Sequence, residues 1–212
     1  MPEIDRINGG SDWIDLDFVE RERTPEQIIE KGIRLHLAGL SLSNTKQHLE
    51  RVGVQRSRTA IHNWVQKADL QPMGTRSSNY IALDETVIQL GTERYWLYTA
   101  VDPTTNEFLH VKLFPTTNSG LTQVFLRQLH EKHDIDDATS LIDDADHLQA
   151  ALSRLGLQFQ IRRHGNRNSV ERVFREVKRR TSSFSNTFSH VEPPTAEVWL
   201  EAFVVWWNRC QS

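Results

Sequence analysis

The chain has 212 residues, of which 38% are hydrophobic and 25% are charged, and its formal net charge is −3. This length and composition predict one substantial domain or a medium domain joined to a small one, and they exclude a disordered or fibrous chain. A single cysteine and the lack of any run of about 18 apolar residues predict a cytoplasmic protein without disulfides or membrane contact.

Charge is distributed unevenly along the chain. Residues 24–70 hold seven basic residues against four acids, and residues 162–180 hold eight against two. Residues 131–146, in contrast, hold seven acids and one lysine. Because charges act over about a Debye length, ~8–10 Å, each block can act on its own. The small negative net charge therefore does not exclude a nucleic-acid partner.

After an acidic segment at residues 1–23, the pattern becomes helical. Thr24 can cap a helix and Pro25 suits its first turn. Apolar residues at helical spacing predict one buried face, formed by Ile28, Ile29, Ile33, Leu35, Leu37 and Leu40.

Two further helices complete a predicted module at residues 24–70. The second is expected to begin after Ser43 or Asn44, Gly53 ends it, and Ser57 starts the third. This is the helix-turn-helix layout, although a plain three-helix bundle with solvated basic side chains would have the same sequence pattern. The outward residues expected to contact DNA are Arg56, Arg58, Thr59, His62 and Asn63.

Strands and helices alternate after a polar linker at residues 71–79. The expected strands are 80–90, 94–101, 108–114, 139–143 and 158–162, and the expected helices are 119–133, 146–155, 169–180 and 195–208. Three successive strands followed by alternating helix and strand predict an α/β domain over residues 80–212. Its expected core is a mixed five-stranded sheet flanked by helices.

Three acids have unusual positions in this pattern. Asp84 interrupts an apolar strand and Asp143 ends another, where a carboxylate is costly unless it is paired, hydrogen-bonded or metal-bound. If the first and fourth strands are parallel neighbours, both acids point into one crevice, and Glu171 can reach it from a following helix. Three such carboxylates form an all-oxygen site suited to Mg²⁺ or Mn²⁺ and to phosphoryl transfer.

Structural roles are the alternative for each acid taken alone. Asp84 also fits a strand-end or turn carboxylate, and Glu171 fits the first turn of a helix, where the helix dipole favours an acid. Glu85 and Asp144 are competitors one position away, but alternation along a strand turns them to the opposite face.

A polar, basic loop leads into the helix that carries Glu171. Its residues and those of the helix behind it suit DNA phosphates, and a solvated charged face is the alternative. The expected contacts are Asn166, Arg167, Asn168, Arg175, Lys178, Arg179 and Arg180.

Five motifs carry a family resemblance: Leu83-Asp-Glu-Thr86, Tyr95-Trp-Leu-Tyr98, Ala100-Val-Asp102, Ile142-Asp-Asp-Ala145, and Asn168-Ser-Val-Glu-Arg-Val-Phe-Arg175 followed by Lys178-Arg-Arg180. Together, over residues 24–209, they resemble the DDE transposases of insertion sequences, most closely the insertion sequence six family in a haloarchaeal form. The resemblance implies an RNase H-like fold preceded by a helix-turn-helix. It also implies a catalytic, metal-binding triad of Asp84, Asp143 and Glu171.

The implied activity is metal-dependent DNA cleavage and strand transfer. The partners would be double-stranded DNA, as terminal inverted repeats and target, and further copies of the chain in a homodimer or higher oligomer. Two departures stand out: the short spacing from Asp143 to Glu171, and Asp146-His147 where relatives tend to have a proline and an aromatic residue. The alternatives are a catalytically inactive relative acting as a DNA-binding regulator, and a ribonuclease H-like nuclease.

Overall fold

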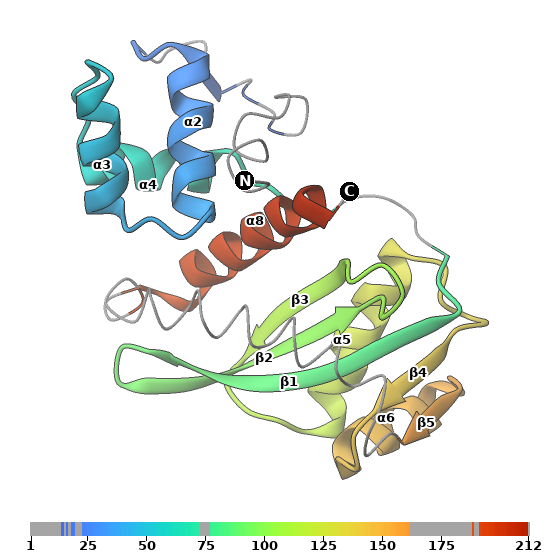
Figure 1. The fold of residues 1–212 in the computed structure, drawn as a ribbon. Helices are drawn as coiled ribbons and strands as arrows, with labels where there is room; N and C mark the ends of the chain where they lie inside the picture. Colours follow the sequence, from blue (N-terminus) through green and yellow to red (C-terminus); the bar gives the residue numbers. More distant parts are fainter. Residues whose placement is uncertain are drawn as a thin grey trace. The chain divides into compact units, whose positions relative to one another are not determined.

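The chain forms two compact units, Met1–Gln71 with Pro194–Cys210, and Pro72–Pro193 with Gln211–Ser212. The computed structural model describes residues 14, 16, 18–19, 23–72, 77–161, 188 and 191–211. In Figure 1 the first unit contains the blue-to-cyan helices and the red C-terminal helix, and the second contains the sheet with its yellow and orange helices.

The second unit is built on a mixed five-stranded sheet. Its strands are β1 (Tyr80–Leu90), β2 (Glu93–Val101), β3 (Phe108–Phe114), β4 (Thr139–Ile142) and β5 (Phe159–Ile161). They lie in the order β3-β2-β1-β4-β5. The pairs β1–β2 and β2–β3 are antiparallel, whereas β4 is parallel to both β1 and β5. This order and these directions confirm the predicted RNase H-like, mixed α/β sheet.

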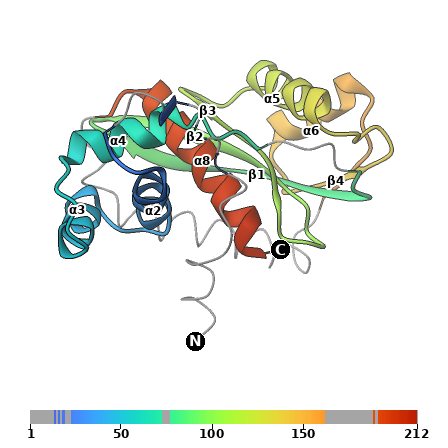
Figure 2. The same ribbon diagram turned by 90° about the horizontal axis from the view of Figure 1, so that it is seen from above.

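Helices α5 (Ser119–Lys132) and α6 (Asp146–Leu155) lie together over one face of this sheet (Figure 2). The Asn118 side chain accepts a hydrogen bond from the Leu121 backbone N–H at the start of α5. Gly156, at φ 69°, ends α6 in the left-handed conformation that glycine adopts without a steric penalty.

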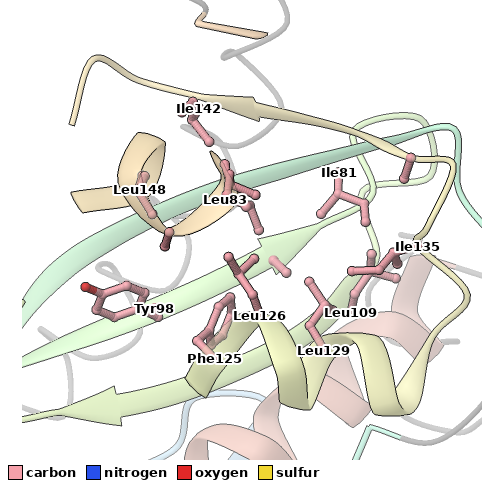
Figure 3. Close-up of a cluster of buried hydrophobic side chains, with 14 of the residues drawn as sticks. Ile81, Leu83, Tyr98, Leu109, Phe125, Leu126, Leu129, Ile135, Ile142 and Leu148 are labelled. Carbon is pink, nitrogen blue, oxygen red and sulfur yellow. The ribbon is translucent and has the colours of Figure 1, made fainter. Parts of the chain in front are cut away.

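The main core lies between the sheet and these two helices. Figure 3 labels its larger members, which are Ile81, Leu83, Tyr98, Leu109, Phe125, Leu126, Leu129, Ile135, Ile142 and Leu148. Successive side chains of a strand point to opposite faces. Ile81 and Leu83 therefore face α5 and α6, while Ala82 and Leu141 form a separate buried contact on the other face.

The helical unit begins with α2 (Glu26–Leu37), α3 (Leu42–Arg51) and α4 (Arg58–Lys67). The prediction that Thr24 caps the first helix was wrong, because Pro25 is the cap of α2 and no side-chain hydrogen bond caps it. Its buried side chains come from all three helices and include Ile29, Ile33, Leu49, Ile61 and Trp64. Helices α2 and α4 approach closely, because a Cβ added at Gly32 would lie 3.0 Å from the Trp64 ring.

Serine side chains begin two of these helices. Ser57 accepts a hydrogen bond from the Ala60 backbone N–H and caps α4, as the sequence predicted. The prediction for α3 was wrong by two residues or more, because Ser41, not Ser43 or Asn44, is its cap. The Ser41 hydroxyl accepts from the Asn44 backbone N–H, so Asn44 is the donor and lies inside the helix.

The C-terminal helix α8 (Pro193–Gln211) groups with the helical unit for most of its length. The Trp199 ring meets His36 of α2 edge to face, with centroids 6.2 Å apart, and stacks on Phe203 at 5.6 Å. The Gln66 side chain of α4 donates to the Thr195 carbonyl. The sequence had assigned this helix to the 80–212 domain, and its observed contacts differ because its aromatic side chains meet α2.

Candidate metal and nucleic-acid site

The parallel pair β1–β4 brings Asp84 and Asp143 to the same level of the sheet. Ala82 pairs with Leu141 in this ladder, and each aspartate lies two positions further along its segment. Both therefore continue the face of Ala82 and Leu141, away from α5 and α6. Two carboxylates on one face suit a Mg²⁺ ion, which one or two carboxylates typically hold. The sequence-based expectation that these strands are parallel neighbours is confirmed.

The two aspartates differ in their position along the strands. Asp143, predicted as the last residue of its strand, directly follows β4, and Asp84 lies inside β1 and not at its end. Strand β1 continues to Leu90 because it stays paired with β2, where Asp84 is opposite Thr99. On its β4 side, the described ladder of β1 stops at Ala82. Asp84 therefore lies just past the point where the parallel ladder stops.

Backbone N–H groups hold one oxygen of each aspartate. The Glu85 N–H donates to Asp84 Oδ1 at 2.9 Å, and the Ala145 N–H donates to Asp143 Oδ1 at 3.1 Å. Both side chains are half-buried, and Ala145 is also the residue from which α6 begins. The start of α6 and the orientation of Asp143 are therefore coupled.

Glu85 points to the opposite face of the sheet, as alternation predicted. Its Oε1 lies 3.1 Å from Nε2 of His147 in the first turn of α6. Within the described part of the chain, neither His147 Nε2 nor Glu85 Oε2 has a hydrogen-bond partner, so this contact is not a formed hydrogen bond. The His147 ring also meets Tyr98 edge to face, with centroids 6.2 Å apart.

Burial disfavours the charged form of both partners in this contact. It raises the pKa of Glu85 to about 7, and the negative charges of Asp84 and Asp143 add to the increase. Burial also lowers the pKa of His147, although Asp143 and Asp146 oppose that shift. The sequence singled out His147 only as a departure from a motif. The signal in the sequence that could have indicated this contact is Glu85, an acid at a core-facing position of a strand.

The remaining acids near this point are directed elsewhere. Asp144 is exposed and its Oδ1 accepts from the Gln149 side chain at 3.2 Å. Asp102 accepts from the Thr104 backbone N–H and from the Ser78 hydroxyl, each at 2.7 Å, so it organises the β2–β3 turn. Within the described ranges, Asp84 and Asp143 are the acids that share one face at the end of β4.

Glu171, the predicted third carboxylate, lies outside the described residues. The same holds for the predicted phosphate contacts Asn166, Arg167, Asn168, Arg175, Lys178, Arg179 and Arg180. Among the residues that are described, no three His, Cys, Asp or Glu side chains gather as a metal site. The two level aspartates match the oxygen donors that Mg²⁺ and Mn²⁺ prefer and form part of such a donor set.

Helix α4 carries most of the predicted DNA contacts of the helical unit. Arg58, Thr59 and Asn63 are exposed, and His62 is half-buried, which lowers its pKa. These side chains are therefore presented from one helix whose Trp64 and Val65 form part of the core.

Arg56 is held by contacts within the helical unit, in contrast to its expected outward position. Its Nε donates to Thr24 Oγ1 at 2.6 Å, and its Nη1 donates to the Gln55 carbonyl at 2.7 Å. Arg56 is half-buried and links the start of α2 to the start of α4. A guanidinium occupied in this way has fewer donors left for DNA.

The sequence was compared with protein families and with known proteins. No family model matches the chain. It is 29% identical over 197 residues to an uncharacterized protein of Methanocaldococcus jannaschii, covering 92% of this chain and 91% of that protein. In the described ranges, no helix has the length and apolar character needed to cross a membrane.

Solved structures of similar shape include retroviral integrase cores. The BIV integrase catalytic core domain has a TM-score of 0.44 and 16% identity, covering 60% of this chain and 82% of that chain. The HTLV-2 integrase catalytic core domain, in complex with magnesium, has a TM-score of 0.44 and 13% identity, covering 61% and 86%.

Proposed function

We propose that this chain is a DNA transposase of an insertion sequence, a DDE enzyme of the insertion sequence six family in a haloarchaeal form. The observation that carries the proposal is the level placement of Asp84 and Asp143 across the parallel pair β1–β4. These aspartates also occupy the first two acidic positions of the motifs that resemble the family.

In this proposal Asp84, Asp143 and Glu171 hold Mg²⁺ or Mn²⁺. A bound ion of this kind activates a water or a 3′-hydroxyl and stabilises the leaving oxygen in phosphoryl transfer. The backbone N–H groups of Glu85 and Ala145 fix one oxygen of each aspartate. This preorientation lowers the cost of ordering the carboxylates when the ion binds.

The helical unit would bind the terminal inverted repeats of the element as a helix-turn-helix. Arg58, Thr59, His62 and Asn63 present donors and acceptors from α4, and Arg56 stabilises the start of that helix. The basic segment at 162–180 would contact the phosphates of the ends and the target DNA. The protein would act in the cytoplasm as a homodimer or higher oligomer on DNA.

The test is a cleavage and joining assay with duplexes that carry the inverted repeats flanking the gene. Asp143→Asn should abolish joining in Mg²⁺ while the shift of end DNA in a gel stays unchanged. Asp144→Asn is the matched control, because Asp144 is exposed and differs by one position. Equal joining by wild type and Asp143→Asn would exclude the proposed site.

A DNA-binding regulator is the second candidate, favoured by His147, which stands in place of the family's aromatic residue and contacts Glu85. Such a protein would bind the ends and cut none of them, even in Mn²⁺. A ribonuclease H-like nuclease would instead cut RNA–DNA hybrids and leave the ends of the element intact.

A further inference from the structure

The contact between Glu85 and His147 links the two segments that carry the aspartates. Glu85 follows Asp84 in β1, and His147 lies in the first turn of α6, behind the turn that starts with Asp143. The Glu85 Oε1 and His147 Nε2 atoms are 3.1 Å apart. The contact lies on the face of α5 and α6, opposite the aspartates.

Among the described residues, the backbone pairing between these two segments ends before the aspartates. The parallel ladder stops at the pair Ala82–Leu141, before either aspartate is reached. Beyond it, the described backbone ladder no longer sets the separation between Asp84 and Asp143. A side-chain contact one residue after Asp84 is therefore well placed to set that separation.

The surroundings of His147 restrict its movement. Its ring meets the ring of Tyr98, which is 1% exposed. The Tyr98 hydroxyl in turn lies 3.3 Å from Thr122 Oγ1 on α5. His147 therefore has a supported position beside Glu85, where their 3.1 Å contact limits how closely the segment of β1 that carries Asp84 can approach the start of α6.

We propose that Glu85 and His147 act as a positioning pair that sets the distance between Asp84 and Asp143 and thereby the affinity for a divalent cation. The inference rests on the proposed metal-dependent function. Neither side chain is a ligand in it, since both act from the opposite face of the sheet. Residues that orient metal ligands from behind typically change metal affinity about 10- to 100-fold when they are replaced.

A simple charge effect would also connect Glu85 to cation binding, because a negative charge near the site attracts any cation. That effect depends on Glu85 alone and does not require His147. Positioning requires both partners, so the two substitutions must show coupling in a double-mutant cycle. The cycle therefore separates the two explanations.

The experiment measures Mn²⁺ binding to the full chain by calorimetry, without DNA. Glu85→Gln and His147→Phe should each weaken binding about tenfold, and the double variant should bind about as weakly as the weaker single variant. Glu131→Gln is the matched charge control, because Glu131 is exposed on α5, and it should bind like wild type. Wild-type affinity in His147→Phe, or a double variant about a hundredfold weaker, would overturn the pairing.

Two further measurements keep the result interpretable. Thermal unfolding in EDTA checks that each variant folds, and His147→Gln replaces His147→Phe in the cycle if the latter does not. Asp84→Asn tests the underlying site, since Mn²⁺ binding that survives this substitution contradicts the proposed metal-dependent function. Loss of binding in Asp84→Asn together with wild-type binding in His147→Phe contradicts only the positioning pair.

Discussion

The two faces of the sheet give neighbouring carboxylates opposite environments. On the face covered by α5 and α6, Glu85 is half-buried beside His147 and its pKa is raised to about 7. On the other face, Asp84 and Asp143 are half-buried and level with each other. A single step along β1 separates the two situations. The face of the sheet to which an acid points therefore decides whether it contacts the packed helices or is available to the proposed metal site.

The largest expected effect concerns the face of the sheet that carries the proposed metal ligands. At saturating Mn²⁺, Asp84→Asn should lower strand joining by roughly a thousandfold, because a proposed metal ligand is lost. Glu85→Gln should lower joining no more than about tenfold under the same conditions, because a positioning effect is largely overcome by excess metal. A single-turnover joining assay measures both rates, and equal losses in the two variants would contradict the assignment of faces.

The next effect tests the packed face by itself. Leu83 is 4% exposed and faces α5 and α6, so Leu83→Ala should lower the free energy of unfolding by about 2–5 kcal/mol. Val87 is in the same strand but 49% exposed, so Val87→Ala should cost no more than about 0.5 kcal/mol. Urea unfolding followed by circular dichroism gives both values. Similar costs would mean that Leu83 does not pack against the helices.

The free energy of unfolding should depend on pH through Glu85, which distinguishes this residue from the exposed acids. Its folded-state pKa of about 7 exceeds the ordinary value of 4.5, so folding favours the protonated carboxyl. The resulting stability is fully present below about pH 4.5 and is lost as the pH rises through 7. Glu85→Gln should remove this loss and gain roughly 1–3 kcal/mol over wild type at pH 8.

The measurement for this pH effect is unfolding in EDTA between pH 4 and pH 8. Glu131→Gln, which removes an exposed acid of the same kind, should follow the wild-type curve. A Glu85→Gln curve parallel to that of wild type would show that burial does not shift this carboxyl.

The smallest effects compare two arginines of the helical unit. Arg58 is exposed, so Arg58→Ala should weaken end binding and reduce the salt slope of log affinity by about 0.9 if it contacts one phosphate. Arg56 is held by Thr24, so Arg56→Ala should instead cost roughly 1 kcal/mol of stability. Salt-dependent fluorescence anisotropy and thermal unfolding separate the two. A large change in salt slope for Arg56→Ala would assign it to DNA.

Local patterns predicted most of the elements, because they depend on neighbouring residues. The alternation that begins at Tyr80 and the turn at Gly91 located β1 and β2 to within one residue at their ends. The serine at position 57 located the start of α4, since capping is a local hydrogen bond. Side-chain partners far apart in the sequence were not predictable. The Thr24 contact of Arg56 and the His147 contact of Glu85 belong to this class.

The sequence by itself determined the order of strands and helices along the chain and the alternation that separates Asp84 from Glu85. It also determined that an acid lies within β1 and another directly after β4. Only the tertiary structure decided that these strands pair in the register that makes Asp84 and Asp143 level. It also decided that α8 groups with α2 and α4. The physical reason is that periodicity selects which face of an element is buried, whereas packing of all the elements together selects what that face meets.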